Sequence, residues 1–256
     1  MYQSDSPKSV QKPLPTMYDL PSEYPEELGL PDEFHDFQPQ LLRETCKLPT
    51  HDDIFIGTDL NIYYDSRHTQ WHKRPDWFLV LGVPKAKQQE DLRWSYVIWQ
   101  EGVSPFLVVE LLSPGTEDED LGRAPRRIDQ PPGKWDVYER LLRVPYYVVF
   151  DRYQNGFRLF KLTGIRYEEE PITDNRYWFE DLEMGLGLWE GSFQDAAGVW
   201  LRWYDAHGEW VLTSAEVAEQ EKQRAEQEKQ RAEQEKQRAD KLAARLRELG
   251  INPEEL

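Results

Sequence analysis

The sequence contains a single cysteine, Cys46, among its 256 residues. One thiol can form neither an internal disulfide nor a cysteine cluster for a metal, so a reducing cytoplasm is the expected location. Apolar runs are short, and none approaches the ~20 residues that a membrane-spanning helix needs. Residues 1–28 are polar and rich in proline, without the apolar segment of a signal peptide. We therefore expect a protein without disulfides and without membrane partners.

An excess of positive charge is also absent, because the formal net charge is −17. Residues 218–256 hold nine Lys and Arg against ten Asp and Glu, which leaves −16 on the rest of the chain. Such a body disfavours general, non-specific binding of nucleic acid. The negative net charge does not exclude a DNA enzyme, since the local electrostatic potential at the active site decides whether DNA can bind there.

Signatures of nucleophilic catalysis are missing too. The chain has no GxSxG sequence, and no local motif around Cys46 indicates a catalytic thiol. P-loop and zinc-finger spacings are likewise absent. A metal-independent hydrolase therefore has little support.

Aromatic residues, in contrast, are plentiful, with 10 Trp, 13 Tyr and 10 Phe, and they allow a sizeable core. Proline spacing and charge patterning divide the chain into three parts. We predict a flexible proline-rich arm over 1–28, one folded domain over 29–212, and a charged helix over 213–256.

The domain is expected to belong to the α/β class with a mixed sheet. Apolar runs predict strands over 53–65, 76–83, 94–100, 105–113, 146–153 and 156–164, with further short strands up to about 212. A short helix is expected over 32–46, limited by Pro39. A second is expected over 133–144, where Trp135, Tyr138, Leu141 and Leu142 follow helical spacing.

The C-terminal segment repeats "AEQEKQR" three times between residues 218 and 238. All residue types in the repeat favour helix, and its charges pair at i,i+3 and i,i+4. The seven-residue period suggests a coiled coil, but each heptad offers only one small apolar position, an alanine. Two interpretations stay open: a solvated helix that associates weakly at its end, or a parallel dimer that could also bind a protein partner.

Two carboxylates stand out because each lies in an apolar strand. Glu110 interrupts "PFLVVELLSPG", and Asp76 opens "DWFLVLGV". A buried carboxylate costs several kcal/mol unless something compensates it. A divalent cation is a strong compensator, and Mg²⁺ is typically held by one or two carboxylates together with phosphate and water. Asp76 and Glu110 are therefore candidate ligands of Mg²⁺ or Mn²⁺, and a nearby cation would offset developing phosphate charge.

These motifs resemble a known family. "RPDWFLVLGV", "PFLVVELLSPGTEDED" and "GKWDVYERLLRVPYYVVFD" together are similar to the Uma-type restriction endonuclease family, within the PD-(D/E)XK nuclease superfamily. The resemblance covers roughly residues 30–190, and "VPYYVVFD" matches the family strand that ends in an aspartate, here Asp151. It implies a restriction-endonuclease-like core, a mixed sheet flanked by helices with metal at the strand ends, and DNA as the substrate.

The superfamily motif places a lysine two residues after the glutamate, but Leu112 stands there. The resemblance implies that the lysine has moved to the following helix, which makes Lys134 the third catalytic candidate beside Asp76 and Glu110. The alternative is an exposed lysine at a helix start, although a lysine in the first turn is disfavoured by the helix dipole.

Further metal-site acids are less well defined. Related nucleases often supply an acid from the first helix, for which we favour Glu33 or Asp32 over His35. Asp59 is another option, although we favour a turn or strand-end role for it. Asp120 resembles a recurrent family aspartate and could also be a loop cap.

Histidines and basic residues near these acids suggest two other roles. The i,i+4 spacing of His68 and His72 invites a zinc site, but no helical pattern surrounds them. Two basic stretches flank the proposed site and are either phosphate contacts or ordinary surface cations. Their members are Arg67, His68, His72, Lys73 and Arg74 in the first, and Arg123, Arg126 and Arg127 in the second.

Two functions from different classes remain. The first is a Mg²⁺-dependent endonuclease that hydrolyses DNA phosphodiester bonds, and cutting both strands together would require a homodimer. The second is an inactive scaffold that keeps the nuclease fold and assembles through its C-terminal helix.

Overall fold

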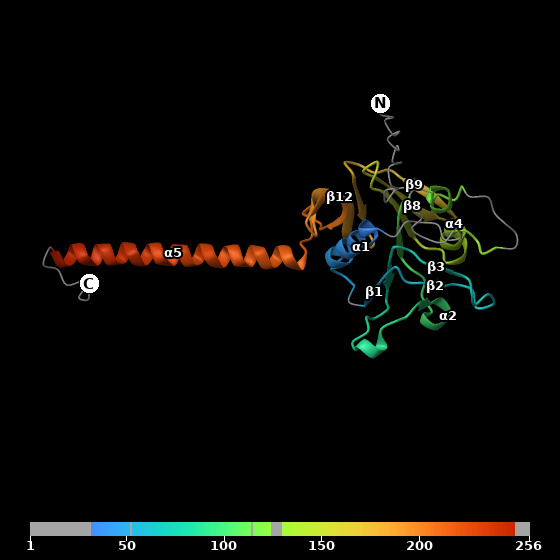
Figure 1. Cartoon of the computed structure of the whole chain (residues 1–256), viewed down its shortest axis with the longest axis horizontal. Helices are drawn as coiled ribbons and strands as arrows, with labels where there is room; N and C mark the ends of the chain where they lie inside the picture. Colours follow the sequence, from blue (N-terminus) through green and yellow to red (C-terminus); the bar gives the residue numbers. More distant parts are fainter. Residues whose placement is uncertain (1–31, 52, 114, 124–129, 249–256) are drawn as a thin grey trace, which may run out of the picture.

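The computed structural model of the protein describes residues 32–51, 53–113, 115–123 and 130–248, without the side chains of 246–248. The predicted arm over 1–28 lies outside the described residues. A body of strands and short helices carries one long helix that projects away from it (Figure 1). Within the described part of the chain, no helix combines the length and apolar character needed to cross a membrane.

A six-stranded mixed sheet forms the centre of the body, in the order β1-β4-β6-β7-β8-β9. β6 and β7 are parallel, and the other neighbours are antiparallel. Every residue of β6 is buried, which explains its continuous apolar sequence. The strand bounds are β1 Ile54–Thr58, β4 Trp77–Leu81, β6 Leu107–Leu111, β7 Tyr146–Asp151, β8 Gly156–Thr163 and β9 Arg166–Glu170.

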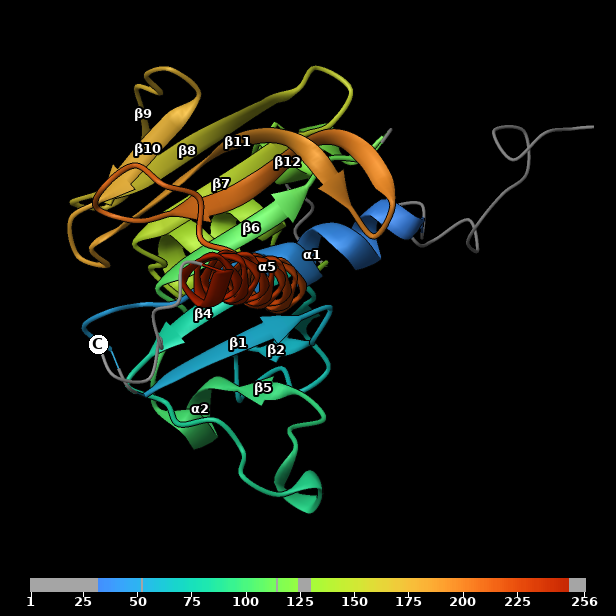
Figure 2. The ribbon, with the colours of Figure 1, turned by 90° about the vertical axis from the view of Figure 1, so that its left-hand side faces the viewer.

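One face of this sheet is covered by α1 (Glu33–Thr45) and by a second, antiparallel sheet, as Figure 2 shows. The second sheet consists of β10 (Arg176–Phe179), β11 (Met184–Phe193) and β12 (Ala196–Tyr204). Trp77, Val109 and Val148 point into this layer, where they meet Leu41 and Trp203.

α1 starts as predicted but is not limited by Pro39. The Asp32 carboxylate caps its N-terminus, and Pro39 lies buried within the helix. Proline removes one main-chain hydrogen bond there. Burial of Leu41 and Leu42 on the sheet outweighs that loss, and tertiary packing overrides the local signal.

The opposite face is covered by a helical segment and a small sheet. The segment comprises α4 (Lys134–Asp136) and the π-helical turn η2 (Val137–Leu141), in which Leu142 N donates to Val137 O at 2.8 Å. The wider turn buries Val137 and leaves Leu141 53% exposed, so the predicted helix is present but the predicted inward position of Leu141 is wrong.

The small sheet has the order β3-β2-β5, with bounds His72–Lys73, Ile62–Tyr63 and Tyr96–Val97. Two strand predictions change here. The segment 53–65 divides into β1 and β2, which belong to different sheets, and the segment 94–100 becomes β5 followed by the helical turn α2 (Ile98–Glu101). The remaining short helices are η1 (Gln89–Asp91) and α3 (Glu117–Asp120).

The long helix α5 (Ser214–Glu248) is anchored at its first turn. Arg202 is 1% exposed and pairs with Glu216, while its Nη2 also donates to Val211 O at 2.7 Å. Thr213 and Glu216 form a reciprocal cap, with Thr213 N donating to Glu216 Oε2 at 2.8 Å. The mixed α/β class, the flanking helices and the charged C-terminal helix are thus confirmed.

Candidate active site

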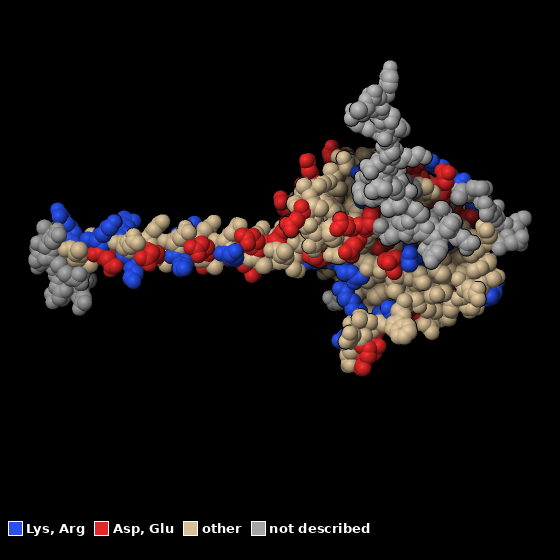
Figure 3. Space-filling view, in the orientation of Figure 1, with Lys and Arg blue, Asp and Glu red and all other residues tan. Residues whose placement is uncertain are grey.

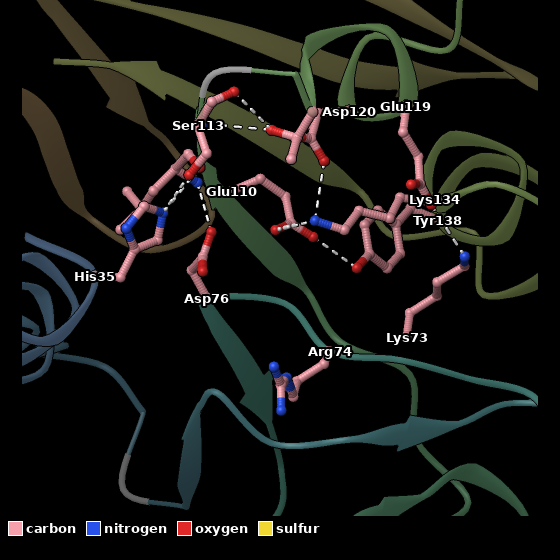
Figure 4. Close-up of polar contacts among 12 residues, drawn as sticks. His35, Lys73, Arg74, Asp76, Glu110, Ser113, Glu119, Asp120, Lys134 and Tyr138 are labelled. Carbon is pink, nitrogen blue, oxygen red and sulfur yellow. Dashed lines mark hydrogen bonds and ion pairs between the residues drawn. The ribbon is translucent and has the colours of Figure 1, made fainter. Parts of the chain in front are cut away.

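The candidate site lies where β4 begins and β6 ends. Trp77 and Val109 face each other in the antiparallel ladder, so Asp76 and Glu110 are the next pair along it. Because side chains alternate along a strand, Asp76 shares a face with Phe78, and Glu110 shares that face with Val108. The two carboxylates that the sequence singled out therefore lie on adjacent strands and on the same side of the sheet (Figure 4).

Glu110 is fully buried, and two residues of the following helical segment contact it. Lys134 Nζ donates to Glu110 Oε2 at 2.9 Å, and Tyr138 OH donates to Glu110 Oε1 at 2.8 Å. Burial nevertheless raises the pKa of Glu110 well above its usual value, with Asp76 and Asp120 adding to the rise against the effect of Lys134. The β6 carboxylate is thus compensated only in part by its protein partners.

Asp76 accepts a hydrogen bond from the main-chain N–H of Leu111 at 2.6 Å, which joins the start of β4 to the end of β6. Burial raises the pKa of Asp76, although Lys134 and His35 both favour its charged form. The backbone bond fixes the carboxylate beside the Glu110 strand and holds it in position before any ligand binds.

Asp120, the last residue of α3, is the third acid of the cluster. Its side chain is 1% exposed, and Lys134 Nζ lies 2.9 Å from Asp120 Oδ1. That oxygen is at ion-pair distance but makes no hydrogen bond of good direction. Tyr147 OH donates to the Asp120 carbonyl at 2.9 Å and fixes the end of α3. Of the two roles foreseen for Asp120, the structure thus favours a place in the site over a loop cap.

Lys134 lies between these acids, as Figure 4 shows. Burial lowers the pKa of its ammonium, but Glu110, Asp120 and Asp76 outweigh that effect and raise it well above the usual value. Lys134 is therefore charged, and it is no ordinary surface lysine at a helix start. The three residues predicted from the sequence, Asp76, Glu110 and Lys134, are brought together.

His35, which the sequence analysis placed behind Glu33 and Asp32, lies at the end of β6. Its Nε2 lies 3.3 Å from Leu111 O and 3.1 Å from Ser113 Oγ, and its Nδ1 lies 2.8 Å from Asp32 Oδ1. Burial lowers the pKa of His35, but the hydrogen bond to Asp32 and the charge of Asp76 outweigh it and raise the pKa. His35 thus secures the end of β6 beside the acids.

The preference for Glu33 or Asp32 over His35 as a further metal-site residue stays a prediction. Glu33 is exposed, and Asp32 is occupied in capping α1 and in pairing with His35 and Arg152. A D-x-x-H sequence at a helix start was the available signal, because it is typical of a capping acid that holds a histidine.

Within the part of the chain that the structure describes, the remaining candidates form no side-chain hydrogen bond or ion pair with the acids of the cluster, although the Asp59 N–H donates to the Asp76 carbonyl at 3.2 Å. Asp59 is exposed and pairs with Arg74 at 3.0 Å. His68 stacks on Trp71 and contacts Asp65, while His72 belongs to β3, so no zinc pair forms.

In the first basic stretch, Lys73 pairs with Glu119 at 3.2 Å and Arg67 with Asp65 at 3.1 Å. In the second, Arg123 lies 3.9 Å from Asp118, while Arg126 and Arg127 fall outside the described residues. Their proposed role as phosphate contacts stays a prediction.

Comparison with known proteins gives the family. A model of the Uma2 family, described as "Putative restriction endonuclease", matches residues 29–194. The chain belongs to the Uma2 family. The resemblance stated from the sequence is thereby confirmed, and the family-matched region of this Uma2 chain contains all the residues of the acid–lysine cluster.

The similar solved structures include a putative nuclease of DUF820 from Anabaena variabilis ATCC 29413. Its identity with the Uma2 chain is 12%, the match covers 56% of this chain and 72% of that one, and the TM-score is 0.34. A search of the curated proteins found no match.

Proposed function

We propose that this Uma2 chain is a metal-dependent endonuclease that hydrolyses DNA phosphodiester bonds. The observation that carries the proposal is the fully buried Glu110, held beside Asp76 at adjoining strand ends with Lys134 against it. Strongly perturbed carboxylates in a specific charge cluster are typical of functional sites. The family description supports the same class of reaction.

The residues present fit a magnesium or manganese site in which the protein supplies only part of the coordination shell. Asp76 and Glu110 are two carboxylates on one face, the number that Mg²⁺ typically takes from a protein. Within the described residues, no three His, Cys, Asp or Glu side chains form a ready-made metal cage. Water and a substrate phosphate would complete the shell.

In this mechanism Asp76 and Glu110 would hold the cation, which would supply a Lewis acid for the phosphodiester and lower the pKa of a water for attack. Lys134 orients the attacking water or offsets the negative charge that develops on the phosphate. Tyr138 and the Leu111 N–H hold the two carboxylates in place, since each donates to one of them. His35 keeps the end of β6 at the site through its contacts with Leu111 and Ser113.

A cleavage assay tests this function. Supercoiled plasmid is incubated with the protein and millimolar Mg²⁺ or Mn²⁺, with and without a chelator. We expect metal-dependent cleavage that disappears in folded Asp76→Asn and Glu110→Gln variants. Cleavage that survives both substitutions would overturn the assignment of the site.

A second candidate is the inactive scaffold, which the projecting helix α5 specifically favours. Acidic and basic side chains alternate along the exposed surface of α5 in Figure 3, and such a helix suits assembly with another copy or another protein. Metal binding separates the two candidate functions, because an ion that binds only the native state must raise the melting temperature of the protein. A scaffold without a metal site predicts no rise, with or without DNA.

A further inference from the structure

The acid cluster of the site contains its own cation. Glu110 and Asp120 are buried, Asp76 is half-buried, and the Lys134 ammonium contacts Glu110 and Asp120 at 2.9 Å each. Counting the carboxylates as ionised, the four groups carry a net charge of −2. One divalent cation would balance that charge, whereas a second would leave an uncompensated positive charge in a buried place.

The carboxylates are arranged around this ammonium. Within the ranges that the structure describes, no three acidic, histidine or cysteine side chains converge on a common point that could hold a metal. Glu110 Oε2 accepts from Lys134, Glu110 Oε1 accepts from Tyr138, and one oxygen of Asp76 accepts from Leu111 N–H. Both oxygens of Glu110 thus already accept a hydrogen bond, and the one bound to Lys134 is held by a cation that a metal ion could replace.

From this geometry we infer that Lys134 is an exchangeable counter-ion. In the protein without metal its ammonium neutralises the carboxylates, and a divalent cation binds by taking Glu110 from it. The inference rests on the proposed metal site and extends it, because it gives Lys134 a role in metal binding as well as in phosphate chemistry. Asp120 keeps its contact with the ammonium and retains the lysine beside the site after the exchange.

The exchange predicts the direction in which metal affinity changes when the Lys134 ammonium is removed. Wild-type protein must break the Lys134–Glu110 contact for each ion bound, so its affinity without DNA is low. A substitution that removes the ammonium and keeps the length of the side chain, Lys134→Met, leaves three uncompensated acids. That variant is expected to bind one Mn²⁺ per chain at least tenfold more tightly than wild type, although it is inactive.

Lys73→Met is the matched control. Lys73 also forms a largely buried ion pair, with Glu119 at 3.2 Å, and Glu119 does not belong to the cluster of Asp76, Glu110 and Asp120. Removal of this ammonium should leave Mn²⁺ affinity within about twofold of wild type, because the contact that Lys73 loses is with Glu119 and not with a carboxylate of the cluster.

The experiment measures Mn²⁺ binding by electron paramagnetic resonance of the free ion, with melting temperature as a second readout. Wild type, Lys134→Met, Lys73→Met and the double variant Lys134→Met/Glu110→Gln are titrated to 10 mM Mn²⁺ without DNA. We expect Lys134→Met to melt below wild type without metal and to show the larger rise with Mn²⁺. The double variant should lose the gain in affinity.

The outcomes separate this inference from the proposed function. If Lys134→Met binds Mn²⁺ no more tightly than wild type, or shows no binding up to 10 mM, the exchange is overturned. The proposed function stands in that case if wild type with DNA binds Mn²⁺ in a way that Asp76→Asn abolishes. If no binding that depends on Asp76 occurs with or without DNA, the proposed metal site itself fails.

Discussion

The acid cluster and the helix α5 use the same types of charged residue in opposite ways. In the cluster, Glu110 is fully buried and Asp120 is 1% exposed, and their partner Lys134 comes from another element of the fold. Along α5 from Glu219 to Arg245 the charged side chains are exposed, and contacts such as that between Gln223 and Glu219 at 3.0 Å are local. Charges in the cluster shift pKa values strongly, whereas charges on the helix are screened by water and salt.

The largest expected difference concerns activity. Glu110→Gln removes one carboxylate charge from the cluster, and we expect cleavage to fall roughly a thousandfold or more, because the metal loses a ligand. Glu228→Gln makes the same chemical change on the exposed surface of α5 and should leave cleavage within about twofold. Initial rates of plasmid nicking compare the two variants, and equal losses would contradict the distinction between the regions.

The second difference concerns stability at the junction between body and helix. Arg202→Met breaks the buried contact with Glu216 and leaves Val211 O without its donor. We expect a loss of about 2–3 kcal/mol in the free energy of unfolding, below the full figure for a buried pair because Glu216 is 36% exposed.

Lys222→Met is the matched change within α5, where the partner Glu219 lies 3.8 Å away. We expect this variant to lose no more than about 0.5 kcal/mol. Urea denaturation measures both values. A loss below 1 kcal/mol for Arg202→Met would show that the anchor is not a stabilising contact.

Much of the central sheet could be predicted from the sequence because continuous burial leaves a continuous apolar run, as in β6 and β7. The short strands β2 and β5 fell within predicted strand segments, but their separate sheet was not foreseen and β3 was missed, since a two-residue strand is defined by its neighbours in space. The π-helical turn was hidden for a related reason. Its register follows from packing Val137 and Tyr138 against the sheet, which the spacing of apolar residues does not specify.

The candidate site, like the fold, contains residues that could be predicted from the sequence and contacts that could not. Asp76 and Glu110 were predictable because each is an acid in an apolar strand, and Lys134 entered through the family resemblance. The contact of His35 with Leu111 could not be predicted, since 76 residues separate the two and the acceptor is a main-chain carbonyl. Side-chain chemistry in a sequence gives no information about which backbone groups remain available at the end of a strand.

A third, smaller difference between the site region and α5 concerns the pH dependence of stability. The folded-state pKa of His35 lies above its unfolded value of about 6.5, so protonation stabilises the fold. This contribution is complete below about pH 6.5 and is lost as pH rises through the folded pKa. The loss in the free energy of unfolding caused by His35→Gln should therefore be about 1 kcal/mol at pH 6 and smaller at pH 8.5. A difference that grows with pH would contradict it.

Asp32 behaves in the opposite direction. Burial raises the pKa of Asp32, but the hydrogen bonds from His35 outweigh burial and lower that pKa to about 2. The contribution of Asp32 to stability is therefore present above about pH 4 and is lost as pH falls through 2.

Helix α5 has no histidine, so the same pH titrations should leave the helical signal of α5 unchanged between pH 6 and 8.5.

The smallest expected effect comes from shortening α5. A chain that ends after Gln220 keeps the Thr213–Glu216 cap and the Arg202 anchor but loses most of the exposed helix. The free energy of unfolding of its body should lie within about 0.5 kcal/mol of that of the full chain, and its rate of DNA cleavage should be unchanged, because nearly all the removed side chains that the structure describes are exposed. A large loss of activity would mean that assembly through α5 is required for cleavage.

A crystal of the protein with DNA, soaked in Mn²⁺, tests the central claim most directly, because the ion is located by its anomalous scattering. The account predicts one ion per chain, roughly 2.1 Å from an oxygen of Asp76 and from an oxygen of Glu110. An occupied crystal in which the ion lies away from both carboxylates, or one in which no ion binds beside the DNA, would contradict it.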